Sequence, residues 1–415
     1  MPQSISSLVN RLVKIPNRLR NAVSWYLASL FIDAQKHTQS FAAELSGLHR
    51  SQFSRLLSEH QCLAIDSLKK LGIRIAGLNA RIPLVKGAPW TVFLIIDATL
   101  HNRSSKHVQN SQKFNHGEGW VIGHQWTNII LVVGDRVIPL PPITFLSKNE
   151  CKRRGIAYQT EHEKISDYLS KLDLKEYLGI FDPREILVLA DSAYDDKKLE
   201  NLILSFGWDF VLAIKTIRSV KLPSEVDRAK TKWRQVNALF RDVKKQAPWE
   251  TVRIETAAGK RRRKFRTRLI TAYLKGVKHP MAVVCSEKYT GKGKRRFFAC
   301  SNNEVSVATI LKAYRCRWSI EIFHRTTKSF LGFEHAGVVQ FDSLVSHVHW
   351  VYCAYLLLNE QTKKGDPPMH EKQRRIRELF HAHELKTIRQ LNTRIDGKKE
   401  VKRHCERALQ ELVTT

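Results

Sequence analysis

Apolar residues follow two different rhythms along this chain. In residues 4–80 they recur at helical spacing, as in the stretch 23–34, so this part is predicted to be helical. From Trp90 the rhythm changes to continuous apolar runs such as VFLIIDATL, which are typical of central strands buried on both faces. Prolines and a glycine in Arg81–Pro89 predict a linker between the two parts.

A helix–turn–helix pattern occupies Thr38–His60 in the first part. Apolar residues mark two short helices on either side of a turn at Ser46 and Gly47. Arg50 and Arg55 fall on the exposed side of the second helix, as they would in an element that reads DNA. A plain helical hairpin has the same pattern, so DNA reading by this element is one of two interpretations.

Two of the apolar runs end on an aspartate. The first run is predicted to end at Asp97, and the run Glu185–Ala190 is followed at once by Asp191. A lone buried carboxylate is costly, so Asp97 needs a cation or several hydrogen-bond donors, unless it only caps the strand. Between the two aspartates, Trp126–Val133 predicts a strand of a hairpin, and Thr160 followed by Glu163 predicts the start of a helix.

Residues 215–300 alternate as β-strands do and are strongly basic. A two-stranded ribbon is predicted around Ala257–Gly259. Its second strand carries a run of cations: Lys260, Arg261, Arg262, Arg263, Lys264, Arg266 and Arg268. Contact with phosphates is the natural role of such a ribbon, and a solvated run of charges is the alternative.

The stretch Tyr314–Lys328 contains no glycine or proline and is predicted to form one unbroken helix. Steps of three or four place one set of residues on a shared face: Tyr314, Arg317, Glu321, Arg325 and Lys328. The opposite face, with Ile320 and Phe323, is expected to pack inward in part. One carboxylate among several cations suits a polyanion beside a divalent metal, although an ordinary solvated helix has the same spacing.

Charge and cysteine content narrow the class of protein. Lys and Arg number 70 against 39 Asp and Glu, a formal net charge of +31, which predicts nucleic acid as the partner. The 7 cysteines form no CxxC pair and are odd in number, which argues against a zinc finger or a disulfide framework and favours a reducing cytosol. The first twenty residues are too polar for a secretory signal, and no apolar run is long enough to predict a membrane span.

Three acidic residues thus stand out: Asp97, Asp191 and Glu321. The order strand, hairpin, helix, strand, helix, with these carboxylates at two strand ends and on a later helix, predicts an α/β fold with an RNase H-like mixed-sheet catalytic core. Carboxylates suit Mg²⁺ or Mn²⁺, and two such ions would serve an in-line phosphoryl displacement.

The same patterns divide the chain into five segments. Residues 1–88 are expected to form a helical DNA-binding domain, and residues 89–216 the first part of the RNase H-like core. A basic β-rich insertion follows at 217–300, and the second part of the core at 301–343. A helical C-terminal region completes the chain at 344–415, where His347 and His349 are expected to be packed residues and not ligands.

At this point the sequence resembles a known family. Tyr314, Arg317, Glu321 and Lys328 match Y-(2)-R-(3)-E-(6)-K, the signature of the IS-four group of bacterial DDE transposases. Asp97-Ala98-Thr99 resembles the first D-x-T motif of that group, and Asp191-Ser192-Ala193-Tyr194 resembles its second motif.

The resemblance implies a function for each of these residues. Asp97, Asp191 and Glu321 would be catalytic and hold the metal pair, while Tyr314, Arg317 and Lys328 would bind DNA at the ends of a mobile element. Trp318 and Arg325 on the same helix, Arg50 and Arg55, and Arg261 and Arg263 of the ribbon are further candidate DNA contacts. Relatives flip a base against a tryptophan, for which Trp233 and Trp249 are candidates here.

The function expected from this resemblance is cut-and-paste DNA transposition. The partners would be the terminal inverted repeats of an insertion sequence and a target DNA, the protein would act as a homodimer on DNA, and its place would be the bacterial cytoplasm, at the nucleoid. Two alternatives stay open, namely a catalytically silent DNA-binding regulator derived from a transposase and an RNase H-like nuclease without strand transfer.

Overall fold

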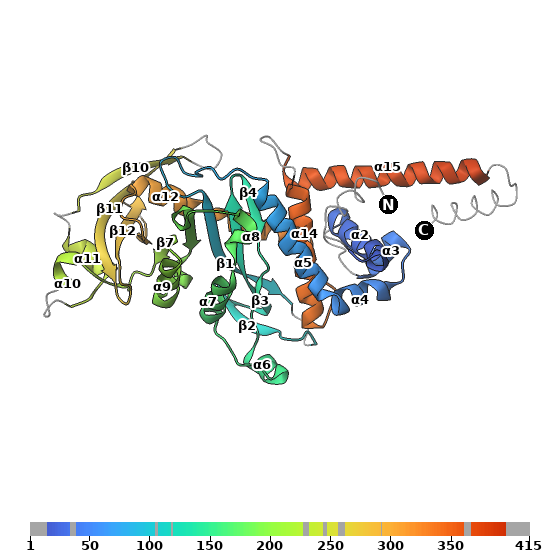
Figure 1. The fold of residues 1–415 in the computed structure, drawn as a ribbon, viewed down its shortest axis with the longest axis horizontal. Helices are drawn as coiled ribbons and strands as arrows, with labels where there is room; N and C mark the ends of the chain where they lie inside the picture. The colour runs from blue at the N-terminus through green and yellow to red at the C-terminus, as the bar shows by residue number, and fades with distance from the viewer. Residues whose placement is uncertain are drawn as a thin grey trace.

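The computed structural model describes residues 15–33, 39–103, 107–117, 119–226, 232–243, 247–255, 262–291, 293–360 and 367–395. The fold is mixed α/β, as expected. In the described part of the chain one continuous mixed sheet has the strand order β2-β3-β1-β6-β7-β13-β12-β11-β8-β9. Figure 1 shows this sheet with helices around it and with a bundle of helices at one end.

The centre of the sheet is built from the apolar runs. Strand β1 (Val92–Asn102) pairs antiparallel with β3 (Gly119–Val133) and parallel with β6 (Ile186–Ala190), which in turn pairs parallel with β7 (Asp209–Ile214). The residues from Val92 to Ile96 have no exposed surface, as expected of a strand covered on both faces.

The prediction that this strand ends at Asp97 is wrong. β1 continues to Asn102 because β3 goes on pairing with it, as far as Asn102 opposite Gly123, while β6 already stops at Ala190. The expected hairpin ladder is confirmed, since β2 (Gln112–His116), β4 (Arg136–Pro139) and β5 (Ile143–Thr144) all pair with β3.

The basic segment extends the same sheet. Its strands are β8 (Ser219–Lys221), β9 (Arg234–Gln235), β10 (Glu250–Glu255), β11 (Arg262–Leu274), β12 (Pro280–Lys288) and β13 (Arg296–Cys300), accompanied by α10 (Pro223–Val226) and α11 (Val236–Asp242). β13 pairs antiparallel with β7, which joins these strands to the central sheet. β10 and β11 form the expected ribbon, although its turn around Ala257–Gly259 lies outside the described residues.

Helices of the first and last segments pack together at one end of the molecule. They are α2 (Asn17–Ile32), α3 (Gln39–Ser46), α4 (Arg50–Glu59), α5 (Gln61–Gly77) and α14 (Phe341–Asn359). α3, a turn at Gly47 with φ +69°, and α4 confirm the expected order of helix, turn and helix. His347 and His349 are buried in this packing, and His347 Nδ1 lies 2.7 Å from the Tyr26 hydroxyl.

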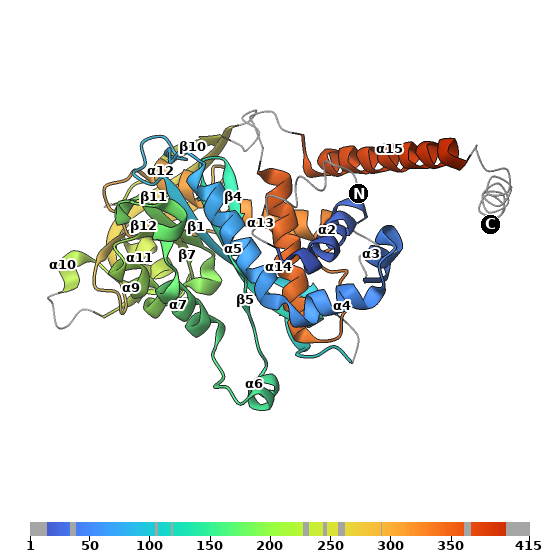
Figure 2. The same ribbon diagram turned by 45° about the vertical axis from the view of Figure 1, so that its right-hand side comes forward.

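The remaining helices complete the layers. They are α6 (Lys148–Arg154), α7 (Glu161–Lys171), α8 (Leu174–Leu178), η1 (Pro183–Glu185), η2 (Ser192–Tyr194), α9 (Lys197–Ser205), α12 (Val307–Arg315), α13 (Trp318–Phe330) and α15 (Met369–Ile395). The capping box of Thr160 and Glu163 opens α7 as expected. Figure 2 shows α15 running away from the body of the molecule. Among the described residues, no helix has the length and apolar character needed to cross a membrane.

Candidate active site

Asp97 and Asp191 lie side by side on the sheet. The last residue pair between the parallel strands β1 and β6 is Ile96 with Ala190. Asp97 directly follows Ile96 in the chain, and Asp191 directly follows Ala190. Neighbouring strands lie about 4.8 Å apart, which brings these two positions close together. The Asp97 carboxylate accepts a hydrogen bond from the amide of Ala98 (3.1 Å), and Asp191 accepts one from the amide of Ala193 (2.8 Å).

Glu321 reaches the same place through Arg317. One guanidinium nitrogen of Arg317 lies 3.4 Å from Asp97 Oδ2, and another donates a hydrogen bond to the Glu321 carboxylate. The side chains of Asp97, Arg317 and Glu321 are 19%, 17% and 29% exposed. The arginine therefore joins the strand that carries Asp97 to the helix that carries Glu321, in a place that is only partly open to solvent.

The prediction of one unbroken helix over Tyr314–Lys328 is wrong. α12 ends at Arg315 and α13 begins at Trp318, with a tight joint at Cys316 and Arg317. Across the joint, amides bond to carbonyls three residues earlier, at 2.9 Å for Cys316 to Ala313 and 3.0 Å for Arg317 to Tyr314. Such bonds tighten a helix without any glycine or proline, so composition gives no sign of the joint. Arg317 is thereby placed at the start of α13, one turn before Glu321.

The electrostatics of the cluster follow from burial and from its excess of carboxylates. Burial raises the pKa of Asp97, the Arg317 guanidinium opposes that rise, and the charges of Asp191 and Glu321 add to it, so that the pKa reaches about 6. Burial alone would lower the pKa of Arg317, but the charges of Tyr314, Asp97 and Glu321 outweigh it and raise the pKa. One arginine thus does not fully balance the nearby acids.

The residues fit a divalent metal by their chemistry. Carboxylate oxygens are the ligands that Mg²⁺ and Mn²⁺ prefer. The pKa of Asp97 is raised mainly by burial and further by the charges of Asp191 and Glu321, and a bound cation would offset both effects. Within the described ranges, no group of three or more His, Cys, Asp or Glu side chains is arranged to hold a metal ion. In the structure the guanidinium of Arg317 bonds to both Asp97 and Glu321.

Three buried polar side chains, those of Asn128, His324 and Tyr352, are hydrogen-bonded next to the cluster, and sequence analysis missed them. Asn128, opposite Asp97 in the β1–β3 register, donates through Nδ2 to His324 Nε2 (3.0 Å) and accepts a hydrogen bond from the Tyr352 hydroxyl (2.6 Å). Burial lowers the pKa of His324 to about 3, so its ring is neutral and can accept. The trio ties α13 and α14 to β3, and its only signal in the sequence is a polar residue inside the apolar run Trp126–Val133.

Glu161 is a fourth acid near the cluster and was also missed. Its carboxylate accepts hydrogen bonds from Gln125 (2.7 Å) and Thr127 (2.6 Å) on β3 and from the Tyr194 hydroxyl (3.0 Å). Burial raises the pKa of Tyr194, and the charges of Glu161 and Asp97 raise it further. Tyr194 therefore keeps its proton and donates it to Glu161 in a hydrogen bond.

The residues expected to bind DNA on α12 and α13 differ in their exposure to solvent and in their contacts within the chain. Trp318 is 52% exposed and Arg325 is exposed as well. Tyr314 packs on Phe298, with ring centroids 4.7 Å apart. Lys328 is already engaged within the chain, since it donates to the carbonyl of Leu100 and pairs with Glu334 at 2.9 Å.

The candidate DNA contacts outside these helices lie on separate elements. Arg50 and Arg55 are exposed on α4, and Arg263 is exposed on β11, while Arg261 lies outside the described residues. Trp233 is 39% exposed, and Trp249 is partly buried beneath arginine side chains.

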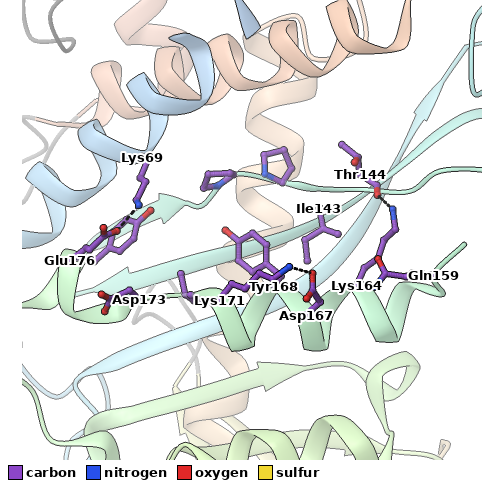
Figure 3. A pocket seen from close by; sticks show the side chains of 14 residues that line it. Lys69, Ile143, Thr144, Gln159, Lys164, Asp167, Tyr168, Lys171, Asp173 and Glu176 are labelled. Atoms are coloured by element: carbon purple, nitrogen blue, oxygen red, sulfur yellow. Dashed lines mark hydrogen bonds and ion pairs between the residues drawn. The ribbon is translucent and has the colours of Figure 1, made fainter. Parts of the chain in front are cut away.

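A cavity among the described residues lies away from the three acids. A cavity of about 550 Å³ lies between α5, α7, α8 and the segment Pro141–Thr144, and contains none of the three acids. Figure 3 shows its charges paired with one another, Lys69 with Glu176 (2.6 Å) and Lys171 with Asp167 (2.8 Å). Such a balanced lining does not favour a polyanion, so we do not assign this cavity to nucleic acid.

Comparison with known proteins supports one class. Residues 157–357, just under half of the chain, match the family model described as the transposase DDE domain. The matched stretch includes Asp191 and Glu321, whereas Asp97 lies before it. No curated protein matches the chain. The class of protein that this match supports is a DDE transposase.

Proposed function

We propose that this protein is the transposase of an insertion sequence, of the IS-four group with the signature Tyr314, Arg317, Glu321 and Lys328. It binds the terminal inverted repeats of its element, cleaves the DNA there, and joins the freed 3′-hydroxyl to target DNA. Two element ends must be cut in concert, so the DNA complex contains at least two copies of the chain.

One observation carries this proposal. The β1–β6 register puts Asp97 beside Asp191, and Arg317 bonds to both Asp97 and Glu321. Three acids that are far apart in the sequence thus approach one another where β6 ends, beside the middle of β1. The match of residues 157–357 to the transposase DDE domain includes two of the three, Asp191 and Glu321, and supports a catalytic role for them.

Each residue has a stated role in the proposal. Asp97, Asp191 and Glu321 would hold divalent metal ions, preferably Mg²⁺. When bound, such ions supply an activated attacking oxygen and stabilise the leaving oxygen in phosphoryl transfer. Arg317 holds Asp97 and Glu321 in place and exchanges one of these bonds for a DNA phosphate. Trp318 and Arg325, which are exposed on the same helix, contact the DNA next to the cleaved bond.

Further grip on DNA comes from outside the catalytic centre. Arg50 and Arg55 on α4 present their exposed side chains to DNA, as does Arg263 on β11. Arg261 belongs to the same proposed set. Lys328 joins this set only if it releases Glu334, because that ion pair competes with a phosphate.

The test is Asp97→Asn. The variant keeps the size of the side chain but replaces a charged ligand by a neutral one, so cleavage of end-bearing DNA in Mg²⁺ should fall by ~10³-fold or more. Binding to the same DNA in a gel shift should persist. Asp167→Asn on α7, where the acid is 46% exposed and pairs with Lys171, is the matched control and should cleave normally.

The outcomes separate the proposal from its alternatives. Full cleavage by Asp97→Asn refutes the catalytic assignment. Binding without cleavage by the unaltered protein identifies a silent regulator. Cleavage without any joined product, in an assay that supplies target DNA, identifies a nuclease that does not transfer strands.

A further inference from the structure

Two helices, α13 and α7, contact the central sheet from opposite faces. Side chains alternate along β3, so Asn128 points to one face while Gln125 and Thr127 point to the other. Asn128 bonds to α13, whereas the other two donate hydrogen bonds to Glu161 on α7. Glu161 therefore lies on the face of the sheet opposite to the helix that carries Glu321.

The carboxylate of Glu161 joins α7 to β3 and to the turn that follows β6. Its Oε1 accepts hydrogen bonds from the hydroxyls of Thr127 (2.6 Å) and Tyr194 (3.0 Å), and its Oε2 accepts one from the amide of Gln125 (2.7 Å). Thr127 is 1% exposed and Tyr194 is 3% exposed, so both hydroxyls would be costly to leave without a partner. The carboxylate is thus fully used within the chain.

Tyr194 belongs to the same tight turn as Asp191. The pairing of β6 with β1 and with β7 ends at Ala190, and η2 follows with Asp191 as its N-cap. The Asp191 carboxylate accepts a hydrogen bond from the amide of Ala193 (2.8 Å), and its carbonyl accepts one from the amide of Tyr194 (3.2 Å). A shift of the Tyr194 ring would therefore move the backbone that carries Asp191.

The far end of this turn is held by two side chains that lead in different directions. Asp195 accepts a hydrogen bond from the first amide after β7 (2.9 Å). Tyr194 leads the other way, through Glu161, to β3, and β3 pairs with β1 along the residues on both sides of Asp97. The contacts of Glu161 therefore connect the turn of Asp191 to the strand pair that carries Asp97.

We propose that Glu161 is a positioning residue of the candidate active site, which sets the place of Asp191 relative to Asp97 through the Tyr194 hydroxyl. The inference rests on the proposed function, because that function assigns the two aspartates as metal ligands. Glu161 is not itself a ligand in this proposal, since its carboxylate accepts hydrogen bonds on the opposite face of the sheet. Removal of a group that orients metal ligands typically lowers metal affinity ~10–100-fold.

Mn²⁺ binding tests the proposal without a cleavage assay. The free Mn²⁺ concentration is read from its electron paramagnetic resonance signal. Glu161→Ala removes the hydrogen bonds to Gln125, Thr127 and Tyr194, and should weaken Mn²⁺ binding ~10-fold or more. Tyr194→Phe keeps the ring and the bonds of Glu161 to β3, and should weaken binding by a similar factor. The double variant should bind no more weakly than Glu161→Ala, because both changes break the same connection.

Glu161→Gln separates positioning from metal ligation. The amide oxygen of the glutamine can accept both hydroxyl hydrogen bonds, and its NH₂ group can donate to the Gln125 side chain once that amide turns over. Mn²⁺ affinity should therefore stay close to that of the unaltered protein. A carboxylate that bound the metal could not be replaced in this way.

Glu150→Ala is the matched control for stability. Glu150 is also an acid with little exposure, 7% of its side chain, and it pairs with Arg153 and Arg154 on α6. Figures 1 and 2 show α6 apart from β1. This variant should lose stability but bind Mn²⁺ as the unaltered protein does. If Glu161→Ala does not fold, Tyr194→Phe carries the test.

The outcomes distinguish this proposal from the proposed function. Unchanged Mn²⁺ affinity in Glu161→Ala or in Tyr194→Phe overturns the positioning role, and so does a loss in Glu161→Gln as large as that in Glu161→Ala. An unaltered protein that binds no Mn²⁺ refutes the metal-dependent function. Amide hydrogen exchange of residues 191–194 then decides the positioning role alone: faster exchange in Glu161→Ala and Tyr194→Phe supports it, and unchanged exchange overturns it.

Discussion

Two clusters of this protein contain the same kinds of residue, Asp and Glu around one Arg, but differ in how deeply they are buried. In the open cluster Asp97 and Glu321 pair with Arg317, and the charge of Asp191 acts on Asp97. In the buried cluster Asp195 and Glu200 pair with Arg218. In the first cluster the paired side chains are 17–29% exposed. In the second, Asp195 and Glu200 are 1% and 0% exposed. Both contain more acid than one arginine can balance.

The difference in burial decides how each cluster compensates for its excess of acidic side chains. Burial raises the pKa of Glu200 to about 8, against the opposing charge of Arg218, with Asp195 adding to the rise. The buried cluster therefore keeps a proton where it lacks a cation. The open cluster lies where β6 ends and is partly open to solvent, so its excess charge is available for binding. The same residue types give structure in one place and candidate chemistry in the other.

The largest effect is expected from Glu321→Gln in the open cluster. The neutral amide is a poor metal ligand, so cleavage of end-bearing DNA in Mg²⁺ should fall by ~10³-fold or more. Thermal stability should change little, because the side chain is 29% exposed and its ion pair with Arg317 is partly solvated. A variant that cleaves normally would show that this cluster is structural, like the buried one.

Arg218→Ala in the buried cluster should lower stability and leave cleavage by the folded protein little changed. It leaves Asp195 and Glu200 buried without a cation, which costs about 3–5 kcal/mol in the free energy of unfolding, measured with urea. Arg184→Ala is the matched control, because its ion pair with Asp182 is exposed and contributes at most about 1 kcal/mol. If the two variants unfold at the same urea concentration, the buried cluster does not stabilise the fold.

The comparison also depends on what holds each cluster in place. Asn128→Ala removes the partner of both His324 and Tyr352 and should cost about 1–3 kcal/mol. If the trio positions the helix of Glu321, cleavage at a temperature where the variant is folded should fall while DNA binding persists. Tyr352→Phe removes one of the two hydrogen bonds and should lower both stability and cleavage less than Asn128→Ala does. Unchanged cleavage in a folded Asn128→Ala would leave the trio a purely structural role.

Much of the open cluster could be predicted from the sequence because its parts are local. Apolar runs that end on Asp97 and Asp191 predict that the two residues are neighbours, and in the structure each directly follows a member of the last β1–β6 pair, Ile96 with Ala190. The spacing from Arg317 to Glu321 predicts one helical turn, and the ion pair confirms that the two side chains meet.

The rest depends on contacts between distant segments. Nothing near Cys316 predicts the joint between α12 and α13, since its backbone stays in the right-handed region. Arg261 and Arg263 are predicted as DNA contacts from a longer run of cations, whereas strand parity and pairing decide which cations of that run meet Trp249. Glu161 looked like an ordinary first residue of a helix, because its three partners on other elements are visible only after folding.

The smallest effect is a change in pH dependence. Because the pKa of Glu200 is raised to about 8, the folded protein holds a proton between the ordinary range of a glutamic acid and that value, while the unfolded chain has released it. Stability must therefore fall as the pH rises through this window, and level off above it. Glu200→Gln carries no titrating proton, so its melting temperature should fall less than that of the unaltered protein between pH 5 and pH 8. Parallel melting curves for the two proteins would mean that Glu200 is ionised in the fold, and that the buried cluster tolerates the excess charge that we assign to the open one alone.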